Sequence, residues 1–308
     1  MTLLVNHVMS SGVESGIFED LLGYYNRFCD NDIRIIKSET PVFNADLYHY
    51  HRPHLEKKLR KNSIVTVHHD LNDTDDWLQY EKFHDRYAES KLILCLNQAQ
   101  QDYLFSKGIY HTKIVPHGYN SDVFRYDYDS KCLGDKLTIG FLSKRYDRKV
   151  KGDAYLWELM NRLDSRFIQF VFVGEGRSIT SQKAMSLGFD VRCYERLPYC
   201  CFGDLYRKLN FLLVTSLFEG GPANIPEAIF SATPIITTPV GMARDYVKDN
   251  INGIILTGNA DIDSERIGFY AKKNNYLSLL KGADEMKNSA MSWREVMKLT
   301  SMHYKMID

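Results

Sequence analysis

Short runs of hydrophobic residues alternate with longer amphipathic segments along the first half of the chain. The amphipathic segments repeat apolar positions every three or four residues, which is the period of an α-helix. The apolar runs are nearly continuous, which is typical of strands in a parallel sheet that is covered on both faces. We therefore predict strands over 2–8, 32–37, 46–50, 64–68, 92–96 and 113–116, and helices over 18–28, 55–60, 77–87 and 98–106.

The same pattern begins again after a polar segment without periodicity, residues 125–136. Here we predict strands over 137–142, 167–173, 191–194, 211–215, 234–237 and 253–256, and helices over 154–163, 204–209 and 223–230. Strands that alternate with helices favour doubly wound α/β domains. The pattern thus predicts an N-terminal domain over 1–128 and a second over 129–288, with a cleft between them. An amphipathic helix over 289–308 would follow and could cross back to the first domain.

Composition and charge exclude several classes of protein. The 308 residues are 44% hydrophobic and 25% charged, which disfavours disorder, collagen-like repeats and a disulfide scaffold. Lys+Arg and Asp+Glu both number 39, so the net charge gives no general preference for nucleic acid. No apolar run approaches the ~18 residues of a membrane span, and the N-terminus lacks a basic signal-peptide region. The six cysteines have no metal-like spacing, and we expect a cytoplasmic protein.

The segment SLFEGGPANIPEA, residues 216–228, contains the most informative chemistry. It places a glycine turn between a predicted strand and a predicted helix. Gly220 and Gly221 lack Cβ atoms, so their backbone N–H groups can approach a ligand closely. The start of the following helix favours an anion such as a diphosphate. The carboxylates of Glu219 and Glu227 can accept hydrogen bonds from hydroxyl groups, which suits a sugar and a ribose.

This segment resembles the E-x7-E motif of retaining glycosyltransferases with the GT-B fold, especially those of family 4. The resemblance continues through a strand and loop over 140–143 that is followed by Arg145 and by Lys151 with a glycine after it. It implies an α/β protein in which two Rossmann-like, doubly wound domains face a central cleft. It also implies that Arg145 and Lys151 hold the donor diphosphate. Because other cations intervene, the choice among those of 144–151 stays open, and a solvated basic loop is the competing interpretation.

The resemblance assigns further roles residue by residue. Glu227 would bind the ribose, and Glu219 would bind the sugar hydroxyls as a catalytic residue. His68 would lie beside the transferred sugar as the second catalytic residue, with His69 as the alternative. The remaining donor-binding candidates are Gly220, Gly221, Pro222 and Ala223 near the leaving phosphate, Leu197 near the base, and Gly12 in the loop after the first strand.

We therefore expect a retaining glycosyltransferase that moves a sugar from a nucleotide-diphosphate sugar to a glycan or lipid-linked acceptor, in surface polysaccharide or glycoconjugate synthesis. Two other classes stay open: a nucleotide-sugar epimerase of the same fold, and a non-catalytic sugar-binding descendant. A glycosyltransferase that acts on protein or on hydroxylated DNA is a further alternative, although the zero net charge disfavours nucleic acid.

We expect no metal and no cofactor. The Asp-x-Asp pairs at 30/32, 127/129 and 261/263 are predicted to form turns. The histidines between 49 and 69 are predicted to be hydrogen-bonded and not metal ligands. A basic run, made of Lys57, Lys58, Arg60 and Lys61, would form either a solvated helix face or a contact with anionic lipid at the inner face of the membrane.

Overall fold

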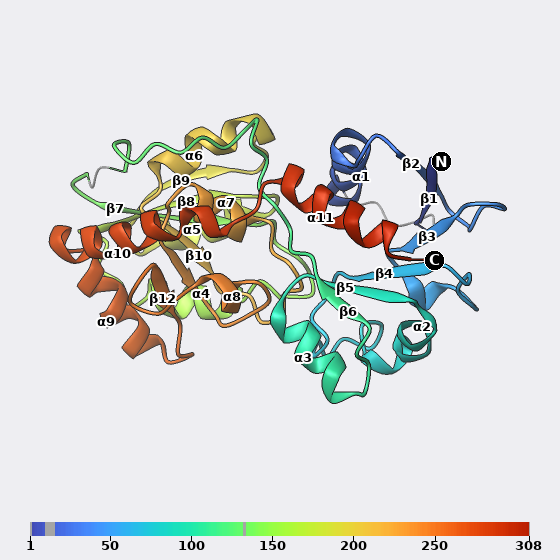
Figure 1. Cartoon of the computed structure of the whole chain (residues 1–308). Coiled ribbons are helices and arrows are strands. Elements are labelled where there is room, and N and C mark those ends of the chain that lie inside the picture. The colour runs from blue at the N-terminus through green and yellow to red at the C-terminus, as the bar shows by residue number, and fades with distance from the viewer. Residues whose placement is uncertain (1, 10–15, 132–133, 308) are drawn as a thin grey trace. The chain divides into compact units, whose positions relative to one another are not determined.

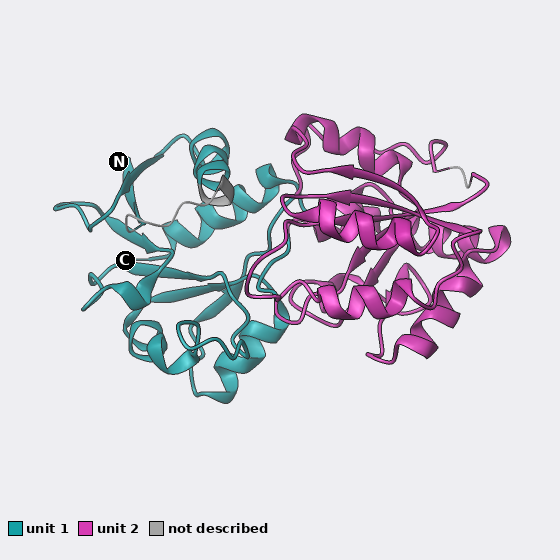
Figure 2. Ribbon diagram, turned by 180° about the vertical axis from the view of Figure 1, so that it is seen from behind, with its two compact units in different colours: residues 1–118, 219–222, 291–308 teal, residues 119–218, 223–290 magenta. Residues whose placement is uncertain are grey.

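Two sheets of six parallel strands form the framework of the protein (Figure 1). The structure is a computed structural model that describes residues 2–9, 16–131 and 134–307. The chain divides into two compact units, which Figure 2 shows in different colours. Unit 1 comprises residues 1–118, 219–222 and 291–308, and unit 2 comprises 119–218 and 223–290. The segment of the glycine turn, 219–222, thus groups with unit 1 although it lies between two stretches of unit 2.

The sheet of unit 1 has the strand order β2-β1-β3-β4-β5-β6. Its strands are β1 (Leu3–Val8), β2 (Ile33–Ser38), β3 (Leu47–Tyr50), β4 (Ser63–Val67), β5 (Leu92–Cys95) and β6 (Thr112–Ile114). The helices of this unit are α1 (Gly16–Phe28), α2 (His84–Glu89), α3 (Gln98–Ser106) and α11 (Trp293–Lys305), with short 3-10 turns η1 (Pro53–Leu55) and η2 (Tyr80–Lys82). The strand order reverses between β1 and β3, which is where doubly wound sheets bind ligands.

The sheet of unit 2 has the order β12-β11-β10-β7-β8-β9 and reverses between β7 and β10. Its strands are β7 (Leu137–Leu142), β8 (Ile168–Val173), β9 (Asp190–Tyr194), β10 (Phe211–Val214), β11 (Ile235–Thr237) and β12 (Gly253–Ile255). Its helices are α4 (Asp153–Met160), α5 (Arg177–Ser186), α6 (Phe202–Lys208), α7 (Asn224–Phe230), α8 (Ala243–Tyr246), α9 (Ala260–Tyr270) and α10 (Lys273–Met286), with 3-10 turns η3 (Tyr199–Cys201) and η4 (Lys287–Ser289).

The C-terminal helix α11 supplies part of the core of unit 1. Trp293, Val296 and Met297 are buried in one cluster with strand residues such as Val5 and Ile64. The helix begins at a capping box, in which the Ser292 side chain and the Glu295 carboxylate satisfy each other's backbone N–H groups. Its apolar face therefore meets the sheet, and α11 also packs beside α1 (Figure 1).

Some predicted elements are wrong. The helix predicted over 55–60 does not form, and the chain there follows η1 as an irregular segment. The backbone N–H group of Leu59 donates to the Glu89 carboxylate instead of to a helix carbonyl. That of Arg60 likewise donates to the Tyr50 hydroxyl. The predicted helix over 77–87 is divided between η2 and α2. The pair Asp261 and Asp263 lies in the first turn of α9, not in a loop, and Asp263 accepts hydrogen bonds from the backbone N–H groups of Thr257 and Gly258.

The basic run of 57–61 is exposed, with Lys57, Lys58, Arg60 and Lys61 all in the irregular segment after η1. It is therefore not a helix face. Within the described part of the chain, no helix is both long and apolar enough to cross a membrane.

Candidate functional site

The carboxyl ends of the strands in unit 1 bring several histidines together. His51 follows β3, His68 follows β4 and His117 lies shortly after β6. The ring centroids of His68 and His117 are 6.4 Å apart. His69, the alternative to His68, instead packs its ring 4.4 Å from Phe83. The structure thus gives His68, and not its neighbour, a place in the histidine group.

The glycine turn contacts this edge of the unit 1 sheet through its carbonyl groups. The side-chain amide of Asn97 donates to the Gly220 carbonyl at 2.6 Å, and His117 Nδ1 donates to the Gly221 carbonyl at 2.7 Å. Burial lowers the pKa of His117 to about 4, so its neutral ring must hold its proton on Nδ1. The turn is therefore held by two side chains that follow β5 and β6.

The close approach of the turn requires glycine at position 220, whereas a Cβ atom at position 221 would displace side chains. A Cβ atom on Gly220 would lie 2.4 Å from the carbonyl oxygen of His68, and one on Gly221 would lie 2.6 Å from a methyl group of Leu96. Glu219, which precedes them, is half-buried, and Pro222 is buried. Packing within unit 1 is thus one reason for these glycines, and their approach to a ligand stays a prediction.

A small cavity adjoins His68. It is lined by His68, His117 and Thr66 together with apolar residues of α1, β5 and α11, and leaves about 20 Å³ in which the centre of a water molecule can move. This volume suffices for about one ordered water with polar partners.

In unit 2, the loop after β7 contains the predicted diphosphate-binding cations. This basic loop, residues 143–152, runs beside the end of β10: the Thr215 hydroxyl donates to the Lys151 carbonyl at 2.8 Å, and Leu217 N–H donates to the Val150 carbonyl at 2.8 Å. Gly152 adopts a φ of +68°, and a Cβ there would lie 1.8 Å from the Thr215 carbonyl oxygen. Glycine is therefore required where the loop enters α4.

Three cations of the basic loop lie near two aromatic rings. The ammonium groups of Lys144 and Lys151 lie 4.7 and 5.6 Å from the ring centroid of Tyr146. The Arg145 guanidinium lies 5.9 Å from the ring of Trp157. Of the cations left open in 144–151, Lys144 therefore lies beside the same ring as Lys151.

A buried arginine that we did not predict supports this loop. Arg177 has no exposed surface and donates to the backbone carbonyls of Ser143 and Lys144 while it pairs with Asp153. Its guanidinium also lies 4.5 Å from the Phe141 ring. In the sequence, Arg177 is indistinguishable from an ordinary surface arginine at the start of a helix.

Glu227 is buried on α7 and bound by two tyrosines. The Tyr199 hydroxyl donates to one carboxylate oxygen at 2.8 Å, and the Tyr206 hydroxyl donates to the other at 3.2 Å. Burial raises the pKa of Glu227 to about 7, and the two tyrosine hydroxyls oppose that shift only in part. A carboxylate retains acceptor capacity beyond two hydrogen bonds, so Glu227 can bind a further hydroxyl.

The other predicted residues are placed as follows. Ala223 is half-buried and precedes α7 as its N-cap residue, and Leu197 packs against the hydrophobic cluster around Tyr206. Leu197 also lines a groove of about 660 Å³ over β8, β9 and α6, but Arg145, Lys151 and Glu227 do not. Gly12 lies outside the described residues. Hence the structure brings His68, Gly220 and Gly221 together in unit 1, and it places Arg145, Lys151 and Glu227 in unit 2.

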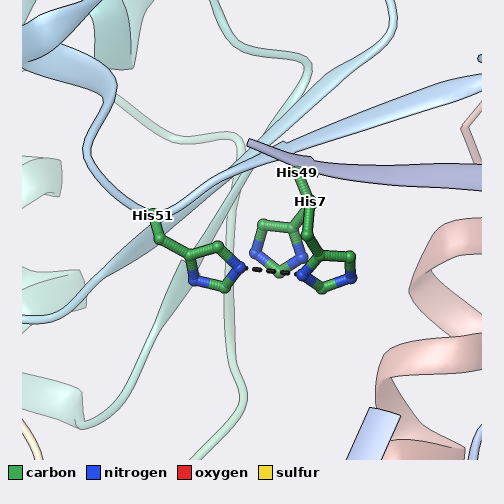
Figure 3. A group of neighbouring side chains, drawn as sticks. All are labelled: His7, His49 and His51. Atoms are coloured by element: carbon green, nitrogen blue, oxygen red, sulfur yellow. Dashed lines mark hydrogen bonds between the residues drawn. The ribbon is translucent and has the colours of Figure 1, made fainter. Parts of the chain in front are cut away.

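Three buried histidines form a group that could hold a metal ion. His7, His49 and His51 each offer a ring nitrogen, and these atoms lie within 4.8 Å of one another (Figure 3). His7 was missed by the sequence interpretation, because nothing in its strand distinguishes it from a core residue. The pairing of β1 with β3 sets His7 opposite His49.

Comparison with known proteins relates part of the chain to glycosyltransferases. Residues 136–266, which include the basic loop, Glu219 and Glu227, match the family model of glycosyl transferases group 1. The Vi polysaccharide biosynthesis protein VipC/TviE of Salmonella typhi is 28% identical over 107 residues, which are 34% of this chain and only 18% of that protein.

Solved structures match the whole chain in fold. HepE (Alr3699) of Anabaena, in complex with UDP and glucose, has a TM-score of 0.75 at 13% identity and covers 99% of this chain and 100% of its own. Sucrose-phosphate synthase of Thermosynechococcus elongatus has a TM-score of 0.77 at 15% identity, covering 99% of this chain and 98% of its own. The predicted GT-B fold is thus confirmed.

The contacts of the glycine turn predict that Gly220→Ala destabilises the protein. The added methyl group would meet the backbone of His68, which cannot move as a flexible side chain can, and overpacking of this kind costs about 1–3 kcal/mol. Thermal and urea unfolding measure the effect. Gly23→Ala is the matched control, because its Cβ meets nothing within 4 Å in the interior of α1 and should stabilise by about 0.5–1 kcal/mol. Equal stability of Gly220→Ala and the wild type would contradict the contact.

Burial of Glu227 predicts a pH-dependent stability difference. At pH values between the ordinary carboxyl pKa and about 7, Glu227 is protonated in the folded chain and ionised in the unfolded chain. Its contribution to stability is therefore full at low pH and is lost as pH rises through 7. The unfolding free energy of the wild type minus that of Glu227→Gln should therefore fall between pH 5 and 7, by at most about 1.4 kcal/mol per pH unit. Urea titrations at several pH values test this. The exposed Glu265→Gln should give a flat difference, and a flat difference for Glu227→Gln would refute the prediction.

Proposed function

We propose that the protein transfers a sugar from a nucleotide-diphosphate sugar to an acceptor hydroxyl and retains the anomeric configuration. The observation that carries the proposal is the family match over 136–266, which includes every donor-binding candidate of unit 2. A uridine nucleotide is the first donor to test, because HepE has been solved with UDP and glucose.

In this proposal the basic loop holds the donor diphosphate. Arg145 can form two parallel hydrogen bonds with phosphate oxygens, and Lys151 and Lys144 add point charges beside Tyr146. Three cations in one loop can compensate the charge of a diphosphate, so we propose that transfer requires no metal. Arg177 would act by holding the backbone of the loop in place.

Glu227 would bind the ribose. Its carboxylate already accepts from Tyr199 and Tyr206, and ribose hydroxyls would add hydrogen bonds to the remaining lone pairs. Such bonds favour the ionised form of Glu227, so donor binding would lower its pKa. Leu197 would contribute an apolar contact near the base.

The reaction centre would combine Glu219, the glycine turn and His68. Glu219 would accept hydrogen bonds from sugar hydroxyls, and backbone N–H groups of 220–223 would stabilise the negative charge that grows on the leaving phosphate. Retention would follow from attack of the acceptor on the face that the leaving group occupies. The leaving phosphate oxygen would receive the acceptor proton as the old glycosidic bond breaks and the new one forms.

We propose a glycan or lipid-linked acceptor, as in the synthesis of surface polysaccharides. The name of the Salmonella relative, a polysaccharide biosynthesis protein, supports this choice. The exposed cations Lys57, Lys58, Arg60 and Lys61 would suit an anionic membrane surface on which such an acceptor is presented.

Donor binding predicts a selective rise in melting temperature. A ligand that binds only the folded state stabilises it, so a panel of UDP-, GDP-, ADP-, CMP- and dTDP-sugars should contain one that raises Tm equally with EDTA and with Mg²⁺. Arg145→Ala should weaken binding roughly 10- to 100-fold by removing a charge-assisted contact, whereas Lys273→Ala, an exposed cation on α10, should not. No shift at saturating concentration would refute the donor site, and loss of the shift in EDTA would refute metal independence.

Glu219 separates transfer from binding. Glu219→Gln should abolish transfer to an acceptor glycan yet largely keep the donor-induced Tm shift, because the diphosphate and ribose contacts persist. Product formation is followed by mass spectrometry, with Glu265→Gln as the control. Conversion of the donor sugar to its epimer without any acceptor would instead indicate an epimerase. Unchanged transfer by Glu219→Gln would remove Glu219 from the reaction centre.

A further inference from the structure

A continuous chain of hydrogen-bonding groups runs through the core of unit 1 to His68. The Tyr304 hydroxyl on α11 lies 3.2 Å from His7 Nε2. His7 Nδ1 lies 2.9 Å from His51 Nε2, a contact drawn in Figure 3, and His51 Nδ1 lies 2.9 Å from His68 Nε2. The four groups come from α11, β1, and the ends of β3 and β4. This hydrogen-bonded chain of side chains thus joins the C-terminal helix to the predicted catalytic histidine.

A branch of the same chain leads to Thr66. Tyr304 lies 2.6 Å from His49 Nδ1, and His49 Nε2 lies 2.7 Å from the Thr66 hydroxyl. The phenol of Tyr304 has one proton and two imidazole neighbours, His7 and His49, so only one of them can receive it.

The imidazoles in this chain are neutral. Burial lowers the pKa values of His7, His49 and His68 well below the ordinary value and that of His51 to about 3. A neutral imidazole has one N–H donor and one acceptor nitrogen. The hydrogen bonds from Tyr304 to His68 must consequently all be donated in the same direction along the series. If the donor and acceptor exchange roles in one of them, they must exchange roles in the others.

The two contacts of Tyr304 distinguish the directions. Hydrogen bonds donated by O–H groups are shorter than those donated by N–H groups. The phenol therefore donates over the 2.6 Å contact to His49 and accepts over the 3.2 Å contact from His7 Nε2–H. The Thr66 contact fits either direction, because a hydroxyl both donates and accepts.

We propose that Tyr304, His7 and His51 are positioning residues that fix His68 in the tautomer protonated on Nε2. In this direction His7 Nδ1 accepts from His51 Nε2–H, and His51 Nδ1 accepts from His68 Nε2–H. The Nδ1 atom of His68 is then an acceptor. The consequence for the reaction rests on the proposed function: His68 would accept a hydrogen bond from a sugar hydroxyl and would not donate one.

A metal ion in the same place would give a different outcome. Each ring nitrogen of His7, His49 and His51 takes part in the chain or its branch, so an ion bound by these residues would break it. Metal analysis of the purified protein is therefore part of the test. A stoichiometric metal that depends on His7 would overturn the proposal.

The direct test is NMR of the full chain labelled with ¹⁵N-histidine, which distinguishes the two tautomers of each ring. His68 should be protonated on Nε2, and His68→Asn identifies its signals by their loss. In Tyr304→Phe the His7 Nε2–H group would lose its acceptor in the core. A buried N–H without an acceptor is rarely tolerated, so the direction of the hydrogen bonds should reverse. His68 should then lose the Nε2–H tautomer in favour of Nδ1–H.

Thr66→Val provides a second route if Tyr304→Phe does not fold. It removes the acceptor of His49 Nε2–H without a large change of shape, so His49 should move its proton to Nδ1. The Tyr304 hydroxyl should then donate to His7 Nε2, and His68 should change to the Nδ1–H tautomer.

Tyr50→Phe is the control, because this buried hydroxyl of unit 1 accepts from Arg60 N–H and lies outside the hydrogen-bonded series. An Nδ1–H tautomer in the wild type, or one tautomer shared by the wild type and both variants, would overturn the proposal. No nucleotide sugar is present, so this result is independent of donor binding.

Discussion

Parallel pairing of every described strand is the constraint on which the candidate site depends. It brings the carboxyl ends of six strands to one edge of each sheet, and the strand order reverses between β1 and β3 and between β7 and β10. At a reversal the connecting helices leave toward opposite sides, so the loops that follow the two strands are left beside each other. In unit 2 this places the basic loop beside Thr215, and in unit 1 it places His7 opposite His49.

Within this framework, hydrogen bonds to neighbouring side chains and loop carbonyls fix several buried polar groups in the core. An unpaired buried polar group costs about 1–3 kcal/mol, so each has to find partners that the sheet alone does not supply. Arg177 satisfies its guanidinium with loop carbonyls and thereby orders the loop. Glu227 is satisfied by two tyrosines, and His7, His51 and His68 are hydrogen-bonded in series. In each case a group that could act on a ligand is oriented by the side chains around it.

The sequence predicted the elements whose hydrophobic pattern is strong and local. The predicted bounds of α3 and β7 coincide with the observed ones, whereas the helix over 55–60 failed because backbone N–H groups there bond to side chains of distant elements. Glu227 and Gly220 were found because their motif is contiguous. Tyr304 and His7 were not found, because they are 297 residues apart and only the folding of α11 against the sheet brings them together. Side-chain chemistry that depends on such distant pairs is absent from any local pattern.

The composition of unit 1 from three separate stretches of chain has a consequence for synthesis. Its core is completed by Trp293, Val296, Met297 and Tyr304, which lie in the last of those stretches. Domains generally fold as units while the chain emerges from the ribosome. Residues 1–118 of unit 1 are translated first, yet the central hydrophobic cluster of this unit stays incomplete until α11 has emerged. The first sheet to be made is therefore the last to be finished, and until then its apolar surface is available to chaperones.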